Sequence, residues 1–366
     1  SSRLVRREGR RREGFNIDKM RAASEKTPPF FMREFALLFN WENAMLRVVL
    51  LALLCSTISQ ADDQMRPTKN DGELKHWLQN MVWHHRFSVE EVQEVTGLDA
   101  ATLQAKLQQF QIRSDNRPPR SDDRLLVLPY PGGRHPRIGF LDGAIQPQRE
   151  TKLSVFCPWD DHSYAVIDAP EAIWSNLGLT YLAHTHIDTV WTKQGITLPK
   201  LEWDRTRDRG FVMQRTLPNG IEFGTQATVR KDHVEFMMWL TNGTQKPLSD
   251  LRVQNCVMLK AMEGFTQQTN DNKVMSRGYA TAKSKDRHRW VITGWDPLHR
   301  AWANEACPCL HSDPKFEDCL PGETKFLRGW FSFFEGEDLE GELDRIEATG
   351  WRKRDVKRPA LSKRKD

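Results

Sequence analysis

The stretch Ile221-Glu-Phe-Gly-Thr-Gln-Ala-Thr-Val-Arg-Lys-Asp-His-Val-Glu-Phe-Met-Met-Trp-Leu-Thr241 decides the fold class of this chain. Apolar residues recur at every second position on both sides of Lys231 and Asp232, which is the period of a β-strand with one buried face. Two such runs joined by two residues are typical of a β-hairpin. We therefore expect antiparallel strands at 221–230 and 233–241.

The same period of two continues through most of the chain beyond residue 124. Turn residues such as Pro218-Asn-Gly220 and Pro321-Gly322 separate the runs. Many short strands at this spacing favour an antiparallel β-sandwich, a mainly β fold, over alternating strands and helices. The predicted strands are Leu125–Leu128, Lys152–Cys157, Tyr164–Asp168, Leu179–His186, Val212–Leu217, Ile221–Arg230, His233–Thr241, Leu251–Lys260, Arg289–Trp295 and Thr324–Phe334, and a helix follows at Leu339–Ala348.

Residues 71–112 have a helical period instead, and Ser88 with Glu91 forms a capping box. The pattern from Ser88 to Leu107 is similar to a helix-turn-helix, in which the second helix enters the major groove of DNA. Only Lys106 is basic among the exposed positions of that second helix, whereas phosphate contacts dominate DNA affinity. We favour a small N-terminal helical domain packed on the sandwich, with a membrane-anchored helix-turn-helix regulator as an alternative.

Residues 45–61 follow the pattern of a secretory signal peptide. Arg47 supplies the positive start, Val48–Cys55 form the apolar core, and Ser59 and Ala61 supply the small residues before a cut. The apolar run is too short to span a bilayer, which takes about 20 such residues. We expect a secreted or periplasmic protein that contacts a membrane only through an uncleaved leader. Residues 1–44 are upstream sequence, a long basic start of the signal, or a cytoplasmic arm.

The charge distribution argues against a nucleic-acid ligand. The formal net charge is +5, but residues 1–44 carry ten Lys/Arg against six Asp/Glu, and residues 350–366 carry eight against two. With Arg47 also set aside, residues 62–349 carry a net charge of −6. The overall basic character therefore does not describe the predicted mature body, and we expect no nucleic-acid partner.

The sequence thus predicts six segments. They are a basic leader absent from the mature protein (1–44), the signal peptide (45–61), the small helical domain (62–115), a polar, proline-rich linker (116–124), the β-sandwich domain (125–349) and a basic disordered tail (350–366).

Two parts of the chain resemble a known fold family. The segment from His233 to Leu251 is similar to the central strands of the galactose-mutarotase-like supersandwich, and Gly178–Trp191 is similar to its histidine-bearing region facing the sugar cleft. This supersandwich occurs in sugar epimerases, in domains of polysaccharide-degrading enzymes and in uncharacterised secreted bacterial proteins. The resemblance covers roughly residues 125–348 and implies a carbohydrate ligand whose protons are handled by histidines and a carboxylate. The chain has no obvious counterpart of the family's catalytic glutamate near its C-terminal end.

Two short motifs are the candidate catalytic residues. His184 and His186 alternate in a predicted strand, so both imidazoles face one side, where they suit acid–base work or metal binding. Glu202 and Asp204 alternate in the same way, and paired carboxylates are the working groups of glycosidases. The competing interpretation of the two histidines is that they are ordinary surface or partly buried residues. The competing interpretation of the two carboxylates is that they lie at a solvated strand end.

Further residues are candidate ligand contacts. The loop from Pro131 to Gly143 combines glycines with Arg134, whose guanidinium can hold a carboxylate or sulfate in bidentate fashion. A structured loop without a ligand explains that composition equally well. Aromatic and polar residues near turns can line a sugar site. The predicted contacts are Arg134, His135, Asp142, Tyr181, Trp191, Trp203, Trp295 and His311.

The segment Asp296–Glu323 is predicted to be a long irregular loop that a disulfide or a bound metal ion holds in place. It contains Cys307, Cys309, His311 and Cys319. In an oxidising compartment, Cys319 would form a disulfide with Cys307 or Cys309. Zinc bound by the three thiolates and the imidazole is the alternative, weakened by the single residue between the first two cysteines. We favour the disulfide and predict no metal and no cofactor.

These features predict a secreted protein that binds or processes a carbohydrate, an acidic or sulfated polysaccharide among the candidates, with His/carboxylate acid–base chemistry if it is catalytic. Binding alone and turnover of epimerase, lyase or hydrolase type stay open. A non-catalytic interaction module held rigid by the cysteine-rich loop is the alternative from another class.

Overall fold

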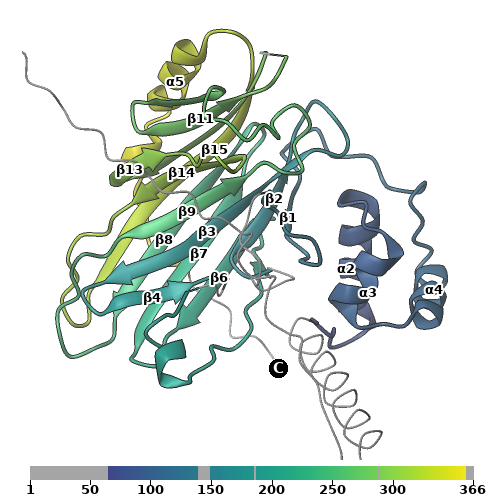
Figure 1. Ribbon diagram of the computed structural model, residues 1–366, viewed down its shortest axis with the longest axis horizontal. Helices are drawn as coiled ribbons and strands as arrows, with labels where there is room; N and C mark the ends of the chain where they lie inside the picture. The colour runs from purple at the N-terminus through teal and green to yellow at the C-terminus, as the bar shows by residue number, and fades with distance from the viewer. Residues whose placement is uncertain (1–64, 139–148, 185–186, 287, 360–366) are drawn as a thin grey trace, which may run out of the picture. The chain divides into compact units, whose positions relative to one another are not determined.

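The computed structural model of the chain describes residues 65–138, 149–184, 187–286 and 288–359, all within one compact unit that spans residues 56–366. Two antiparallel sheets form its body (Figure 1). The seven-stranded sheet has the order β1-β2-β3-β9-β14-β13, with β4 paired to β3, and the eight-stranded sheet has the order β10-β11-β12-β15-β8-β7-β6-β5. The predicted antiparallel, mainly β sandwich is confirmed.

The strands of the seven-stranded sheet are β1 (Val127–Pro129), β2 (Lys152–Phe156), β3 (Tyr164–Ser175), β4 (Gly178–Leu182), β9 (Val253–Met258), β13 (Leu298–Trp302) and β14 (Cys309–Pro314). Those of the eight-stranded sheet are β5 (Asp204–Arg205), β6 (Phe211–Thr216), β7 (Ile221–Val229), β8 (His233–Asn242), β10 (Lys273–Ser276), β11 (Tyr279–Lys283), β12 (Arg289–Asp296) and β15 (Thr324–Glu335). A short 3-10 turn, η3, covers Thr192–Gln194.

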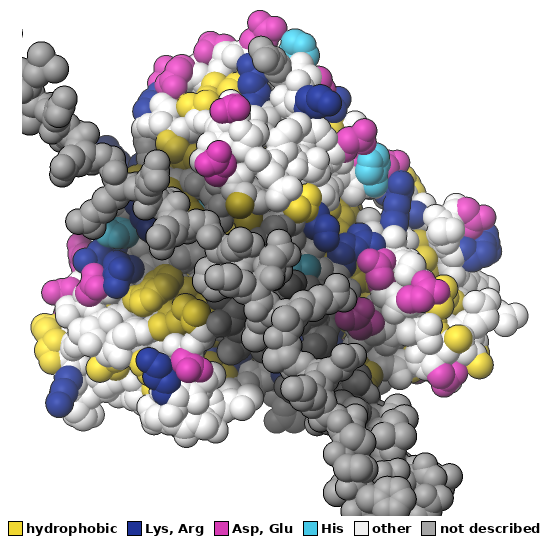
Figure 2. Space-filling model, viewed as in Figure 1, with side chains coloured by type: hydrophobic (Ala, Val, Ile, Leu, Met, Phe, Trp, Pro, Cys, Tyr) yellow, Lys and Arg dark blue, Asp and Glu magenta, His cyan; other side chains and the backbone are white. Residues whose placement is uncertain are grey.

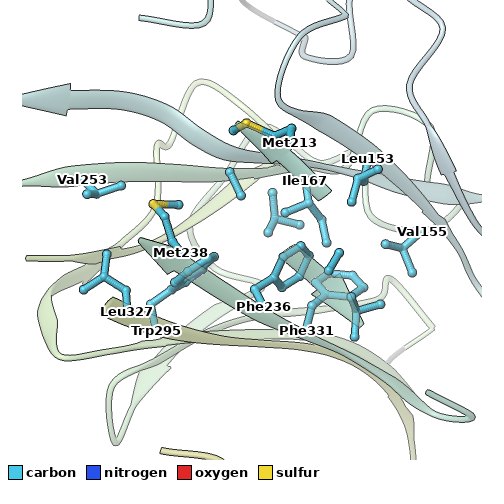
Figure 3. Close-up of a cluster of buried hydrophobic side chains, with 14 of the residues drawn as sticks. Leu153, Val155, Ile167, Met213, Phe236, Met238, Val253, Trp295, Leu327 and Phe331 are labelled. Carbon is cyan, nitrogen blue, oxygen red and sulfur yellow. The ribbon is translucent and has the colours of Figure 1, made fainter. Parts of the chain in front are cut away.

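The hairpin β7–β8 has the register that its sequence predicts. Val229 pairs with Val234 and Ile221 pairs with Asn242. Because side chains alternate between faces, Phe236 and Met238 point into the space between the sheets. There they meet residues of the other sheet, including Ile167 (Figure 3). The hydrophobic core therefore lies between the two sheets.

Part of the outer face of the eight-stranded sheet, at β11, β12 and β15, is also apolar, and a helix covers it. Leu343 and Ile346 of the helix α5 (Leu339–Ala348) and Trp351 of the 3-10 turn η4 (Trp351–Lys353) share a cluster with Trp290 and Trp330 of the sheet. Asp338 caps α5 by accepting a hydrogen bond from the backbone N–H of Gly341. This helix begins and ends where the sequence predicts.

The predicted N-terminal helices are present as α2 (Asp71–Gln79), the π-helix η2 (Asn80–His84), α3 (Val89–Thr96) and α4 (Ala100–Gln109). Both hydrogen bonds of the Ser88–Glu91 capping box form, and Gly97 ends α3 in the left-handed conformation with φ of 72°. The helices share their own cluster of buried apolar side chains, among them Leu78 and Val92. None of the described helices is long and apolar enough to cross a membrane.

The helices dock beside β1 and β2, on the outer face of the seven-stranded sheet (Figure 1). His85 is central to this contact. Its Nε2 lies 2.7 Å from Ser154 Oγ, its Nδ1 lies 3.2 Å from Asn80 O, and its ring meets the edge of Tyr164. Because a carbonyl oxygen only accepts, Nδ1 donates to Asn80 O. Burial disfavours the charged ring, so His85 is neutral near pH 7 and its Nε2 accepts from the Ser154 hydroxyl.

We predict that acid weakens this docking. Burial lowers the pKa of His85 to about 3, below the usual value of about 6.5 for an unfolded histidine. Between these values the unfolded chain binds more protons than the folded chain, so the free energy of unfolding falls as the pH drops, by about 1.4 kcal/mol per pH unit from this histidine. Urea unfolding followed by tryptophan fluorescence at pH 7.5, 6, 5 and 4 measures the slope.

The control for this pH dependence is His85→Gln, which does not titrate. It should be less stable than the wild type at pH 7.5, and its stability should depend less on pH between 6.5 and 4. An unchanged slope in that variant would show that other groups cause the acid sensitivity.

The segment Asp296–Glu323 differs from its prediction as an irregular loop. It contains β13 and β14, which pair with each other, and β14 also pairs with β9. Leu310 points into the core, whereas His311 and Asp313 on the other face of β14 are buried but polar. This strand therefore lacks the apolar alternation that marks the others.

Candidate functional site

A cluster of buried polar side chains lies on the outer face of the seven-stranded sheet. In β9, Val253 and Val257 point into the core, so Gln254 and Cys256 face outward between them. In β3, an irregularity between Asp168 and Ala172 breaks the register with β9, and Glu171 lies within it. The cluster thus begins where a β-bulge redirects a carboxylate.

Glu171 is the centre of the cluster and has a partner on each side. Arg137 Nη2 donates to Oε1 at 2.6 Å and Gln254 Nε2 donates to Oε2 at 2.8 Å. His184 Nε2 lies 3.4 Å from Oε1. The side chains of Glu171 and His184 are 3% and 1% exposed. An imidazole, a guanidinium and an amide therefore surround one buried carboxylate.

The electrostatics keep this carboxylate ionised. Burial alone would raise the pKa of Glu171, but the nearby Arg137, His184 and His311 outweigh burial and hold the pKa well below its usual range. An ionised Glu171 is an acceptor only, so its charge favours an N–H over a lone pair at the Nε2 of His184, 3.4 Å away. The two side chains form a close imidazole–carboxylate pair.

The second half of the cluster lies where β9 and β14 separate. Their backbones pair at Cys309–Met258 and Leu310–Val257. Beyond these pairs, hydrogen bonds between side chains of β14 and the backbone of β9 take the place of backbone–backbone bonds. The Nδ1 of His311 lies 2.8 Å from Asn255 O, and the backbone N–H of Asn255 donates to Asp313 Oδ1 at 3.2 Å. Polar side chains thus close the gap between two strands.

Two thiols adjoin His311. Cys309 Sγ lies 3.5 Å from His311 Nε2, and Cys256 Sγ accepts from Arg137 Nη2 at 3.5 Å. A hydrogen bond from Cys256, together with the neighbouring His311, lowers the pKa of Cys309 to about 4, whereas burial raises the pKa of Cys256. Arg137 bonds to both Glu171 and Cys256, so the two halves form one network.

Outside the ring of His311, further side chains fix its position. Trp302 stacks on it with ring centroids 4.0 Å apart, and Trp302 Nε1 donates to Asp313 Oδ2 at 2.6 Å. Arg300 Nε donates to the same oxygen at 2.9 Å. The imidazole is therefore held by stacking and by a hydrogen bond at Nδ1.

A fully buried ion pair lies beside Glu171. Lys152 and Asp168 are opposite each other in β2 and β3, with Nζ 2.7 Å from Oδ2, and neither side chain is exposed to solvent. Thr151 Oγ1 donates to the other oxygen of Asp168. Burial raises the pKa of Asp168 to about 6, and the charge of Glu171 acts in the same direction. A second, fully buried pair of charges therefore lies next to Glu171.

The predicted catalytic residues are separated in the structure. The strand β4 ends at Leu182, so His184 follows the strand, and His186 lies outside the described residues. Glu202 accepts from Arg149 Nε at 3.0 Å, Trp203 is buried in the core, and Asp204 is exposed. His184 pairs with Glu171 and not with Glu202.

The predicted ligand contacts have several different environments. Tyr181, Trp191, Trp203 and Trp295 belong to the core between the sheets, where packing accounts for them. Arg134 holds Glu91 of α3 with two bonds of 2.6 Å, so it docks the helices.

Two other predicted contacts adjoin the cluster. His135 is partly buried and accepts from the backbone N–H of Arg137 through Nδ1, while His311 lies in the cluster itself. Asp142 lies outside the described residues.

The predicted disulfide is absent. The five described cysteines, Cys157, Cys256, Cys307, Cys309 and Cys319, are free thiols. The backbone of Cys319 pairs with that of Leu248 in an isolated β-bridge, and its Sγ donates to Glu323 O. The backbone of Cys309 pairs instead with Met258 of β9. The prediction was wrong because it treated Asp296–Glu323 as one loop, whereas β14 begins at Cys309 and carries the chain away from it before Cys319.

The sequence interpretation missed Arg137, Glu171, Gln254 and Cys256. Alternation in β9 gave a usable signal, because Gln254 and Cys256 occupy the face opposite Val253 and Val257.

Two cavities of the described structure lie away from the Glu171 cluster. One of about 310 Å³ is lined by residues including Gln226, Arg328 and Val356. The other, about 820 Å³, is lined by residues including Arg117, Arg120 and Trp159, and neither contains a residue of the cluster.

Comparisons with known proteins give no family for this chain. No protein-family model and no curated protein matches it. A human-microbiome protein assigned as a kojibiose phosphorylase aligns over 53% of this chain and 26% of its own length, with 7% identity and a TM-score of 0.33. An Escherichia coli protein assigned as an aldose 1-epimerase aligns over 48% of this chain and 84% of its own, with 10% identity and a TM-score of 0.31.

Proposed function

We propose that the Glu171 cluster binds a carbohydrate and transfers a proton on it. The observation that supports this proposal is the pairing of His184 with Glu171 at 3.4 Å, with Arg137 and Gln254 holding the carboxylate. In this arrangement Glu171 is the positioning residue and His184 is the proton-transfer residue. Imidazole is the side chain best suited to take and return a proton near neutral pH.

The chemistry of the cluster suits a polyhydroxylated ligand. A sugar hydroxyl both donates and accepts a hydrogen bond, and the cluster combines donors with acceptors. Arg137 and Gln254 are donors, the carboxylate of Glu171 is an acceptor, and His184 serves as either according to its protonation. A guanidinium also suits a sugar that carries a carboxylate. We propose an acidic carbohydrate as the ligand class.

The proposal includes export of the chain after cleavage at Ala61. The signal-like residues 45–61 support it, and mass spectrometry of the exported protein would find Asp62 at the mature N-terminus. A DNA ligand has less support, since Lys106 of α4 pairs with Asp71 at 2.8 Å. Acidic and basic side chains are also interspersed over the described part of the face in Figure 2.

The test compares two site variants with a matched control. A glycan array and NMR turnover assays with the wild-type chain identify the ligand and the product. His184→Gln should then lower turnover by about 10²–10⁴-fold, the usual contribution of a general acid or base. Glu171→Gln should shift the pH profile of the remaining activity, because it removes the charge that orients His184.

The control is His162→Gln. His162 pairs with Glu263 at 3.1 Å on the surface, so it is an imidazole–carboxylate pair outside the cluster, and its loss should leave binding and turnover unchanged. If His184→Gln binds and converts the glycan as the wild type does, the cluster is not the site.

A further inference from the structure

We infer that Cys256, Cys309 and His311 form a binding site for a zinc ion. One ligand atom of each residue, Sγ of the two cysteines and a ring nitrogen of His311, lies within 4.8 Å of the other two, and all three residues are buried. This inference goes beyond the proposed function, since acid–base work by His184 and Glu171 needs no metal. It also replaces the ligand set predicted from sequence, because Cys256 of β9 joins Cys309 and His311 in place of Cys307 and Cys319.

The spacing of two ligand atoms fits tetrahedral coordination. Zinc bonds of about 2.3 Å to sulfur and about 2.0–2.1 Å to nitrogen, at the tetrahedral angle, separate the two ligand atoms by about 3.5 Å. Cys309 Sγ and His311 Nε2 are 3.5 Å apart. Thiolate and imidazole together are the ligands that zinc prefers, and two thiolates balance its charge.

The surroundings of His311 have the form of a second coordination shell. Asn255 O can only accept, so His311 Nδ1 carries a proton and Nε2 is the nitrogen that faces Cys309. Metal-binding histidines usually donate their other N–H to a carbonyl or carboxylate in this way. Trp302 stacks on the ring and prevents its rotation, and Arg137 donates to the sulfur of Cys256. The ligands are therefore pre-oriented.

A disulfide between the two thiols is disfavoured by strand geometry. Cys309 is opposite Met258, so Cys256 is its diagonal neighbour, two residues further along β9. Diagonal neighbours in antiparallel strands are about 7–8 Å apart, beyond the usual Cα separation of about 4.4–6.8 Å for a disulfide. A metal ion bridges the two sulfurs without that approach of the backbones. Three protein ligands leave the fourth position for water or a small anion.

The experiment titrates reduced, chelator-treated full-length protein with Zn²⁺ and Co²⁺ under anaerobic conditions. The wild type should bind one ion, and bound Co²⁺ should show sulfur-to-metal charge-transfer absorption. Cys256→Ser, Cys309→Ser and His311→Gln should each weaken Zn²⁺ binding by more than about 100-fold, since changes in the second shell alone cost about 10–100-fold. Cys256→His supplies another ligand atom and should retain binding.

Cys157→Ser and Cys319→Ser are the matched controls. Both remove a buried thiol outside the cluster and should change Zn²⁺ affinity by less than about threefold. Thermal unfolding without metal separates loss of binding from loss of folding, because the serine variants should melt close to the metal-free wild type. Equal loss in the controls, Co²⁺ binding without sulfur absorption, or a Cys256–Cys309 disulfide in anaerobically purified protein that binds no zinc would each overturn the assignment.

Discussion

Replacing Lys152 with methionine should lower the free energy of unfolding by about 3–5 kcal/mol at pH 8. Lys152 and Asp168 lie 2.7 Å apart with no solvent exposure, so the change leaves a buried carboxylate without its cation. Thr151 still donates to Asp168, but a neutral hydroxyl does not compensate the charge, and Glu171 adds repulsion. Urea unfolding measures the loss.

The loss should depend on pH in a direction set by Asp168. Burial raises its folded-state pKa to about 6, above the unfolded value of 3.8, so the folded state holds the proton more tightly. Stability from this group is therefore greatest in acid and falls as the pH rises through that interval. Without Lys152 the carboxyl protonates more readily still, and the cost of Lys152→Met should be smaller at pH 5 than at pH 8.

Two further variants test the cause of this loss. Lys152→Met combined with Asp168→Asn removes both charges and should recover most of the stability. Lys315→Met breaks an exposed pair with Asp250 and should cost no more than about 1 kcal/mol. A loss at Lys152 as small as that at Lys315, or one that does not vary with pH, would contradict the uncompensated-charge explanation.

The sandwich could be predicted because its core strands show their burial in the sequence. In β8, Phe236 and Met238 alternate with side chains of the other face, and a period of two is visible without knowledge of the partner strand. The strand β14 could not be predicted in this way. Its outward residues Cys309, His311 and Asp313 are buried in a polar network, so the strand has the composition of a loop.

Of the cluster, only His184, Cys309 and His311 were predicted, and the physical reason is distance along the chain. Glu171 meets His184 and Gln254 because β3 pairs with both β4 and β9, which no local pattern encodes. The backbone N–H of Ala183 donates to Glu171 O at 2.8 Å, so the register of the β3–β4 hairpin brings His184 to the carboxylate. A prediction of that register would have found the pair.

Trp295→Ala should lower the free energy of unfolding by about 3–5 kcal/mol while leaving carbohydrate affinity unchanged in the folded fraction. Its position beside Asp296 and Pro297 suggested a ring at a loop, but alternation along β12 puts Trp295 with Val291 on the core face. The ring is 1% exposed and packs on Phe236, with centroids 5.7 Å apart (Figure 3). Thermal and urea unfolding measure the loss, and calorimetry at low temperature measures the affinity.

Two companion changes separate lost packing from a lost ligand contact. Trp295→Phe keeps an aromatic ring in the same space and should cost less than Trp295→Ala. Gly329 is opposite Trp295 in β15, and a Cβ there would lie 2.7 Å from the indole, so Gly329→Ala should also destabilise the fold by displacing the ring. If Trp295→Ala melts like the wild type and loses glycan binding, the ring is a ligand contact and not a core residue.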